Sequence, residues 1–257
     1  MNSLLDVAKV PFSTFGSYIS ISIPKGEKDL YFRNHHGGAN NLFPIKTIVN
    51  GEVVEPVIEA QPWMLTLSYG GGRVEICFER PGTVRMRGQG LGLQLGQKHL
   101  MYSEAPDRFA INCPRTRRYQ VELIHGGFEL RQLVPTQPVF PKIAVVSPGK
   151  DGWWELAIDE FWSTWQQPVR ASFDDCLASA KKAFTDFLES MPAARPGDSA
   201  TRRLAAYVDW SCTVGASGLL KRPAMLMSKN WMCNVWSWDQ CFNAMALASG
   251  QPDLAMD

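Results

Sequence analysis

The chain has 257 residues, of which 45% are hydrophobic and 20% charged, and its 26 basic and 25 acidic side chains leave a net charge of +1. This composition is typical of a globular protein long enough to hold two domains. A charge this balanced creates no field that would recruit nucleic acid or an anionic membrane surface. We therefore expect neither of them as a partner.

The sequence shows no feature of an exported or membrane-bound protein. Residues Met1 to Val10 contain no basic segment followed by a long apolar run, and no later run is long enough to span a bilayer. The six cysteines lack C-x-x-C spacing, so we expect them to be free thiols in a reducing compartment. The sequence therefore predicts a cytoplasmic protein with no cofactor and no metal.

The first two thirds of the chain alternate between hydrophobic and polar residues. The alternation is clear in residues 19–23, 74–79, 119–123 and 154–158, and turns rich in Gly and Pro separate these segments. A period of two indicates strands that are buried on one face. Many short strands of this kind predict an antiparallel β-sandwich, with no helix needed before residue 170.

The hydrophobic period then changes to that of α-helices. Ser172, with Asp175 three residues later, is a capping signal for a first helix. A linker containing Pro and Gly at residues 192–197 ends this helix, and Asp198 or Ser199 is predicted to cap a second one.

Apolar side chains spaced three and four residues apart predict the second helix and a third. Their apolar faces consist of Leu204, Ala205, Val208 and Cys212 in the second, and of Trp238, Cys241, Phe242, Met245 and Ala248 in the third. A fourth helix is predicted to start at Pro252. These helices cannot close a core by themselves, so we expect the chain to belong to a larger domain. We expect the sandwich to fold alone and the helices from residue 199 onward to leave apolar faces exposed.

Two segments have only a superficial likeness to cofactor sites. His35 and His36 are adjacent, so on an extended chain they point to opposite faces, and no carboxylate follows at ligand spacing. We interpret them as part of a polar turn. The glycine-rich segment 88–96 does not fit the pattern G-x-G-x-x-G and no helix follows it, so we predict a glycine-rich strand there.

The residues leading into the third predicted helix are the best candidates for ligand binding. One carboxylate, Asp239, lies in the first helical turn, close in sequence to Trp231, Trp236, Trp238 and Lys229. A carboxylate can accept two hydroxyl hydrogens, and indole faces can cover a sugar ring, so this set suits a carbohydrate. The alternative is a buried aromatic cluster in which Asp239 only stabilises the start of the helix through its dipole.

The segment from Val235 to Ala244, with Trp236-Ser237-Trp238-Asp239 inside it, resembles the W-x-W-D-x-x-F element of clan-G glycoside hydrolases. The resemblance is mainly to family 63 and its mannosylglycerate-hydrolase-like relatives, which have an N-terminal β-sandwich and a C-terminal (α/α)6 barrel. It implies a mixed, multidomain fold with an antiparallel β-sandwich over residues 1–168, a linker helix over 169–198, and the first helices of an incomplete barrel over 199–257.

The resemblance also implies roles for the candidate residues. The Asp of this element lines the −1 subsite in the family, so Asp239 and Trp236 are expected to bind the sugar. Trp238 is expected to pack mainly against neighbouring helices, with Lys229 and Trp231 at the rim of the site. The family enzymes invert the anomeric centre, which requires two carboxyl groups roughly 6.5–9.5 Å apart. Asp239 alone does not provide such a pair.

The sequence therefore predicts the N-terminal part of an inverting α-glycosidase acting on glucosides or related sugars. Its partners would be an oligosaccharide or small glycoside substrate and the rest of its own barrel. The general acid and base are expected beyond Asp257, so the segment is expected to contain no catalytic residue and to be inactive alone. Two alternatives remain, namely a glycoside phosphorylase or debranching-type glucosidase of the same plan, and a non-enzymatic carbohydrate-binding sandwich.

Overall fold

The computed structural model describes residues 5–96, 100–113, 117–133 and 142–257, so the first four residues of the segment Met1 to Val10 lie outside it. The strands are β1 (Ile19–Ser22), β2 (Leu30–Asn34), β3 (Asn40–Val49), β4 (Glu52–Val54), β5 (Val57–Gln61), β6 (Met64–Tyr69), β7 (Gly72–Arg80), β8 (Thr83–Gln89), β9 (Gly92–Leu95), β10 (Leu100–Ala105), β11 (Arg108–Asn112), β12 (Arg118–His125), β13 (Gly127–Gln132), β14 (Lys142–Ser147), β15 (Trp153–Phe161), β16 (Thr213–Val214) and β17 (Ala224–Met225). The helices are α1 (Phe173–Ser190), α2 (Ser199–Cys212), α3 (Ser237–Leu247) and α4 (Pro252–Met256).

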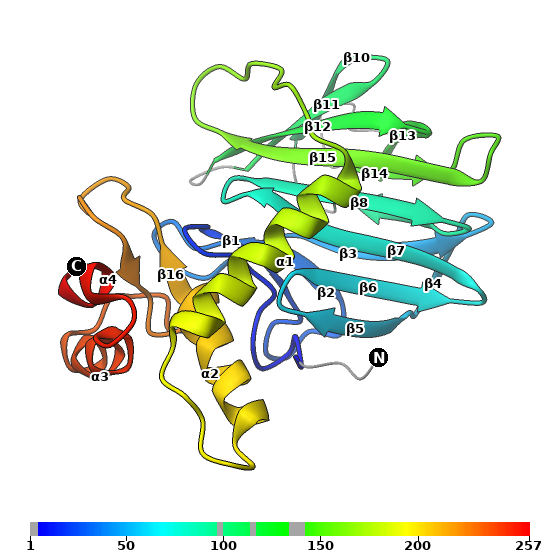
Figure 1. Ribbon diagram of the computed structural model, residues 1–257. Helices are drawn as coiled ribbons and strands as arrows, with labels where there is room; N and C mark the ends of the chain where they lie inside the picture. The colour runs from blue at the N-terminus through cyan, green and yellow to red at the C-terminus, as the bar shows by residue number, and fades with distance from the viewer. Residues whose placement is uncertain (1–4, 97–99, 114–116, 134–141) are drawn as a thin grey trace.

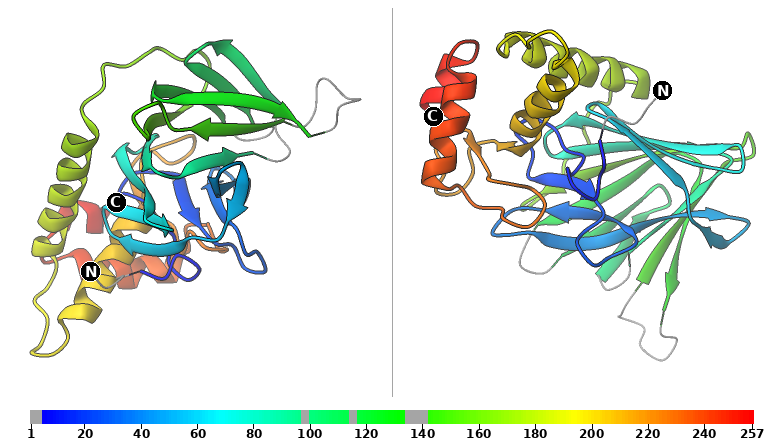
Figure 2. Two further views of the ribbon diagram at one scale, coloured as in Figure 1. Left: turned by 90° about the vertical axis from the view of Figure 1, so that its right-hand side faces the viewer. Right: turned by 90° about the horizontal axis from the view of Figure 1, so that it is seen from below.

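Two large antiparallel sheets make up most of the molecule. Among the described residues, one sheet has seven strands in the order β1-β2-β3-β9-β14-β13, with β4 paired to β3, and the other has eight in the order β10-β11-β12-β15-β8-β7-β6-β5. The two sheets face each other, and the helices lie beside and across them (Figures 1 and 2). The predicted antiparallel β-sandwich is confirmed, and the glycine-rich segment 88–96 forms the end of β8 and strand β9.

The period of two identifies the inner face of the sandwich correctly but not the burial of its outer face. Val74, Ile76 and Phe78 of β7 belong to the core cluster that both sheets share. Their neighbour Cys77 is buried as well, because α1 crosses the outer face of the eight-stranded sheet and Phe173 packs against it (Figure 1). Strands of an antiparallel sandwich are therefore covered on both sides wherever a helix lies over them.

Both ends of α1 have identifiable partners. At its start, the Oγ of Ser172 accepts a hydrogen bond from the backbone N–H of Asp175 at 3.1 Å, so the predicted cap is confirmed. At its end, the guanidinium of Arg202 donates to the carbonyl oxygens of Leu188 at 2.5 Å and of Met191 at 2.8 Å. A cation on the last carbonyls stabilises the C-terminus of the helix and ties α2 to it.

Helix α2 buries only part of its predicted face. Leu204 and Ala205 are exposed, and the buried residues are Ala206, Tyr207, Trp210, Ser211 and Cys212. Cys212 is buried and Val208 packs against the core as predicted, but the prediction left out Tyr207 and Trp210, whose aromatic side chains bury the most area.

An aromatic cluster fastens α1 and α2 to the sandwich. The Trp210 ring lies 5.3 Å from Phe15 and 5.3 Å from Phe187, centroid to centroid. The Oη of Tyr207 accepts a hydrogen bond from the backbone N–H of Ser13 at 2.9 Å and donates to the carbonyl of Pro11 at 3.1 Å. The expectation that the helices from residue 199 onward leave their apolar faces exposed is therefore wrong for α2. One core cluster spans the predicted boundary near residue 168, and the division into domains stays a prediction.

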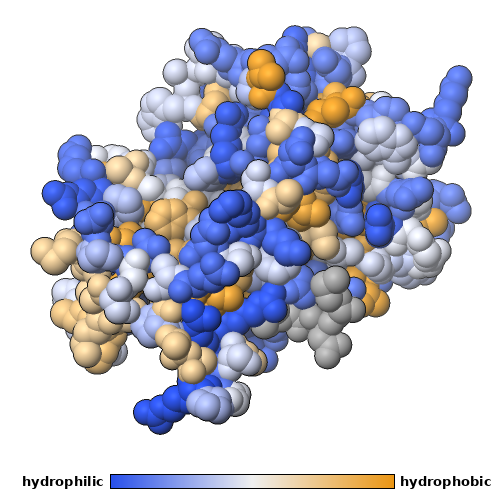
Figure 3. Space-filling model, in the orientation of Figure 1, coloured by the Kyte–Doolittle hydropathy of each residue, from blue (hydrophilic) through white to orange (hydrophobic). Residues whose placement is uncertain are grey.

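Helix α3 does leave an apolar face exposed. Trp238 and Phe242 meet edge to face at 5.9 Å, and together with Met245 they are more than 60% exposed in this chain. Figure 3 shows mainly apolar side chains over α3 and α4. Leu247 is the one buried residue of α3 within the described chain. Trp238 is 62% exposed within the described residues, and its packing against further helices stays a prediction.

In the described ranges, no helix has both the length and the hydrophobicity required to cross a bilayer, and no cysteine forms a disulfide bond.

Candidate functional site

The loop between β17 and α3, residues 226–236, carries the predicted sugar-binding segment and is anchored in the sandwich by Lys229. The side chain of Lys229 is 1% exposed. Its Nζ donates to the Oγ of Ser13 at 3.0 Å and to the carbonyl of Ser17 at 2.5 Å. The prediction that Lys229 lies at the rim of the site is therefore wrong. It is a buried anchor, because the N-terminal segment before β1 provides polar acceptors that the loop itself lacks.

Burial sets the protonation of this lysine. Desolvation lowers the pKa of Lys229 to about 7, because a buried ammonium loses its hydration. No carboxylate pairs with Lys229 among the described residues. At neutral pH the amine is therefore divided between its charged and neutral forms, both of which can donate to Ser13 and Ser17.

Arg33 of β2 holds the same loop from the sandwich side. Its guanidinium donates to the carbonyl of Lys229 at 3.1 Å and to that of Asn230 at 2.6 Å. The side chain is 2% exposed and is oriented by further bonds to Ser22 and Asn41. A planar fork of donors suits two successive backbone carbonyls, and a lysine could not satisfy both in this way.

His35 and Cys233 form a third link between the sandwich and the loop. The Nδ1 of His35 lies 3.1 Å from the Sγ of Cys233, and its Nε2 lies 2.7 Å from the Oγ of Ser20. Burial is the main reason why the pKa of His35 is well below its usual value and the pKa of Cys233 is raised to about 11. Both groups are neutral at physiological pH, so the pair is a structural contact and not an activated thiol nucleophile.

The candidate carboxylate lies just beyond this anchored loop. Trp236 is the N-cap residue of α3, and Asp239 is in its first turn. The Oδ2 atom of Asp239 is buried and has no hydrogen-bond partner among the described residues. A buried carboxylate oxygen without a partner costs free energy, so a donor from outside the described residues is expected to complete the site.

Three exposed tryptophans surround this turn in sequence. Trp231 is 70% exposed, Trp236 is 40% exposed and Trp238 is 62% exposed. Large indole faces in contact with solvent are costly unless they bind something. The loop held by Lys229 and Arg33 therefore exposes its tryptophans at the surface, whereas the side chain of Lys229 points into the sandwich.

A cavity of about 860 Å³ opens between the sandwich and the C-terminal segment beside this loop. Its lining residues are Tyr18, His35, His36, Gly37, Arg117, Trp162, Ser217, Gly218, Leu219, Leu220, Leu226, Cys233, Asn234 and Val235. None of the five sequence-predicted residues lines it, although Val235 directly precedes Trp236.

The polar wall of this cavity was not predicted, since His36 was interpreted only as part of a polar turn. His36 stacks on Tyr18 at 3.8 Å and lies 3.4 Å from a carboxylate oxygen of Glu160. Arg117 lies 4.2 Å above the exposed ring of Trp162 and also faces Glu160 at 3.6 Å. These residues come from four separate stretches of the sandwich, so no local motif connects them. The high tryptophan content after residue 153 was the one available signal.

Comparison with known proteins supports the fold. No family model and no curated protein matches the sequence. Among solved structures, an inverting mannosidase of family GH92 from Bacteroides thetaiotaomicron superposes with a TM-score of 0.57 at 10% identity, over 82% of this chain and 38% of the mannosidase. A second glycosyl hydrolase of family GH92, ccman5, gives a TM-score of 0.57 at 9% identity, over 95% of this chain and 45% of that enzyme.

The chain therefore shares its fold with parts of these two enzymes and spans less than half of their length. Both belong to family GH92, so the likeness supports a glycosidase-like fold without supporting family 63 in particular. The assignment of the Trp236–Asp239 element to that family stays a prediction.

Proposed function

We propose that the chain is the β-sandwich and first helical part of an inverting glycosidase, and that Asp239 and Trp236 contribute to its −1 sugar subsite. The observation that carries the proposal is the buried, unpartnered Oδ2 of Asp239 beside exposed tryptophans, at the end of a loop fixed to the sandwich by Lys229 and Arg33. A sugar hydroxyl is the donor that this oxygen lacks. The glycosidase-like fold supports this choice of ligand.

The substrate is proposed to be a glucoside or a related sugar, and mannosides belong in the test because one of the similar structures is an inverting mannosidase. The acid and base carboxyls are proposed to lie outside residues 1–257. An inverting mechanism requires them on opposite sides of the scissile bond, with room for water between. The part of the protein described above would then bind the sugar and hold the substrate against them.

The stereochemistry of the first-formed product tests this proposal. The protein that includes the proposed acid and base is incubated with aryl α-glucoside and aryl α-mannoside, and the anomeric protons are followed by NMR from the first turnover. The β-anomer appearing first supports an inverting glycosidase. The α-anomer appearing first, or phosphorolysis that requires added inorganic phosphate, would contradict it, the latter in favour of a glycoside phosphorylase.

A further inference from the structure

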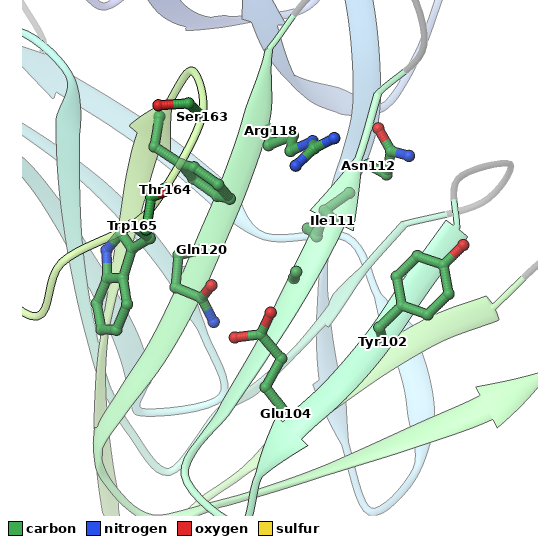
Figure 4. A pocket seen from close by; sticks show the side chains of 11 residues that line it. Tyr102, Glu104, Ile111, Asn112, Arg118, Gln120, Ser163, Thr164 and Trp165 are labelled. Carbon is green, nitrogen blue, oxygen red and sulfur yellow. The ribbon is translucent and has the colours of Figure 1, made fainter.

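A second hollow lies on the outer face of the eight-stranded sheet, over β10, β11 and β12 (Figure 4). Its volume is about 470 Å³, within the range of small-ligand pockets. It is lined by Tyr102, Glu104, Ala110, Ile111, Asn112, Arg118, Gln120, Phe161, Ser163, Thr164 and Trp165. No residue is shared with the cavity near α3 or with the Trp236–Asp239 turn.

The strand register explains why the surface is hollow at this place. Tyr102 of β10 pairs with Ala110 of β11, and Ala110 pairs with Gln120 of β12, so the three side chains form one row across the sheet. The small Ala110 in the middle leaves a gap between the tyrosine ring and the amide. Trp165, from the segment after β15, closes the far side.

Gln120 provides the polar floor. It is 1% exposed, and its Nε2 has no hydrogen-bond partner among the described residues. Figure 4 shows the amide of Gln120 and the carboxylate of Glu104 directed toward the same space. A buried amide with two unused hydrogens is rare in native proteins, and a ligand acceptor in the hollow would satisfy it.

One aromatic wall, Trp165, is held in place by contacts within the chain. The indole Nε1 of Trp165 donates to the Oδ2 of Asp159 at 2.9 Å, and the guanidinium of Arg108 lies 5.7 Å from the ring centroid. Tyr102, on the opposite side, is 47% exposed and its hydroxyl makes no bond to another described residue. Two flat faces held apart in this way suit the C–H faces of a ring-shaped ligand.

We infer that this hollow binds a neutral oligosaccharide, in a position separate from the proposed −1 subsite. Hydroxyl groups both donate and accept, and the hollow offers both, since Glu104 accepts while Gln120, Asn112 and Arg118 donate. The side chains of Glu104, Asn112 and Arg118 make no other hydrogen bond or ion pair within the described residues. The Glu104 carboxylate and the Arg118 guanidinium both line the hollow, so their opposite charges offset and favour a neutral ligand. An apolar ligand would leave the Gln120 amide unpaired.

The position of the hollow follows from its own residues, whereas the choice of a carbohydrate rests on the proposed function. The site would hold a distal part of a glycan, so that a longer oligosaccharide binds more tightly than the sugar unit at the −1 subsite alone.

Affinity electrophoresis of the 257-residue chain tests the inference, with α-mannan, glycogen and a soluble β-glucan each cast in separate native gels. We expect the chain to be retarded in at least one gel. Tyr102→Ala and Gln120→Leu should each raise the dissociation constant at least tenfold. Tyr69→Ala is the matched control, because Tyr69 is 46% exposed in β6 of the same sheet, and it should bind like the unaltered chain.

Thermal unfolding of the variants separates a binding residue from a structural one. Gln120→Leu removes an unpaired buried amide, so it should keep or raise the melting temperature while binding is lost. The inference would be overturned if no gel retarded the unaltered chain. It would also be overturned if the Tyr102 and Gln120 variants were retarded as strongly as the unaltered chain. Retardation lost in Trp236→Ala but kept in Tyr102→Ala would also overturn it, while leaving the proposed −1 subsite standing.

Discussion

The Nζ of Lys229 lies 3.0 Å from the Oγ of Ser13, although 216 residues separate the two in sequence. This contact fixes the loop before α3 to the segment before β1. It places a titratable amine inside the sandwich, in the same loop from which Trp231 and Trp236 are exposed. The position of the proposed sugar-binding turn thus depends on a polar contact with the N-terminal segment.

Lys229→Met should change how stability depends on pH. The folded-state pKa of about 7 lies below 10.5, the ordinary value for a lysine. Between these two values the unfolded chain binds more protons, so the stability conferred by Lys229 rises with pH from about 7 to 10.5. The free energy of unfolding of the unaltered chain, minus that of the variant, should increase across that range by an amount on the order of 4 kcal/mol.

Urea unfolding at pH 6, 8 and 10 measures this difference directly. Lys25→Met, which alters an exposed lysine, serves as the matched control. The contrary result would be a free energy of unfolding of the unaltered chain that exceeds that of Lys229→Met by the same amount from pH 6 to pH 10. That result would show that Lys229 is not buried as described.

Arg33→Lys should loosen the loop while keeping the charge. A lysine cannot donate to the carbonyls of both Lys229 and Asn230 while also reaching Asn41. We expect a loss of about 2 kcal/mol or more in the free energy of unfolding, together with faster proteolytic cleavage within residues 226–236. Arg73→Lys, at a side chain that is 58% exposed, is the control. Cleavage of that loop at an unchanged rate in Arg33→Lys would contradict the proposed clamp.

Gly88→Ala should destabilise the sandwich through overpacking. A Cβ at Gly88 would lie 2.4 Å from the Cε2 of Trp154, a ring that is fully buried and donates to the carbonyl of Leu91. Overpacking of this kind costs about 1–3 kcal/mol. Gly127→Ala, where a Cβ would meet no atom within 4 Å, should cost much less. If the two variants had equal melting temperatures, β8 and β15 would have moved apart enough to accommodate the added methyl group, which would contradict the tight contact described.

Much of the fold could be predicted from local pattern, because strand alternation and helix capping are local properties. The inner face of β7 and the cap at Ser172 follow directly from neighbouring residues. The burial of Cys77 could not be predicted, since it depends on α1 lying over the sheet. Part of the buried face of α2 was missed for a similar reason, because Tyr207 finds its partner at Ser13.

The candidate site was predictable only in part. The residue types around Asp239 indicated carbohydrate chemistry, and the turn does carry exposed tryptophans with an unpartnered carboxylate oxygen. Lys229 was misplaced because a lysine in a polar loop is normally solvated, and only the distant Ser13 and Ser17 make its burial tolerable. The hollow around Gln120 has no local motif, since its residues are brought together by the register of three strands.

The 257-residue chain alone should hydrolyse no glycoside, because the proposed acid and base are not within it. Release of nitrophenol from aryl α-glucosides and α-mannosides measures this, with the unaltered chain and Asp239→Asn assayed side by side. Turnover that Asp239→Asn abolishes would show that the catalytic groups are present in these residues after all.

The central claim is that Asp239 binds substrate. The most direct test is kcat/KM of Asp239→Asn in the protein that includes the proposed acid and base, measured together with its melting temperature. Loss of a hydroxyl contact made in the transition state should lower kcat/KM about 100-fold or more, which corresponds to about 2.7 kcal/mol, with the melting temperature unchanged. Unchanged kcat/KM with a lower melting temperature would contradict the claim and leave Asp239 as a charge that stabilises the start of α3.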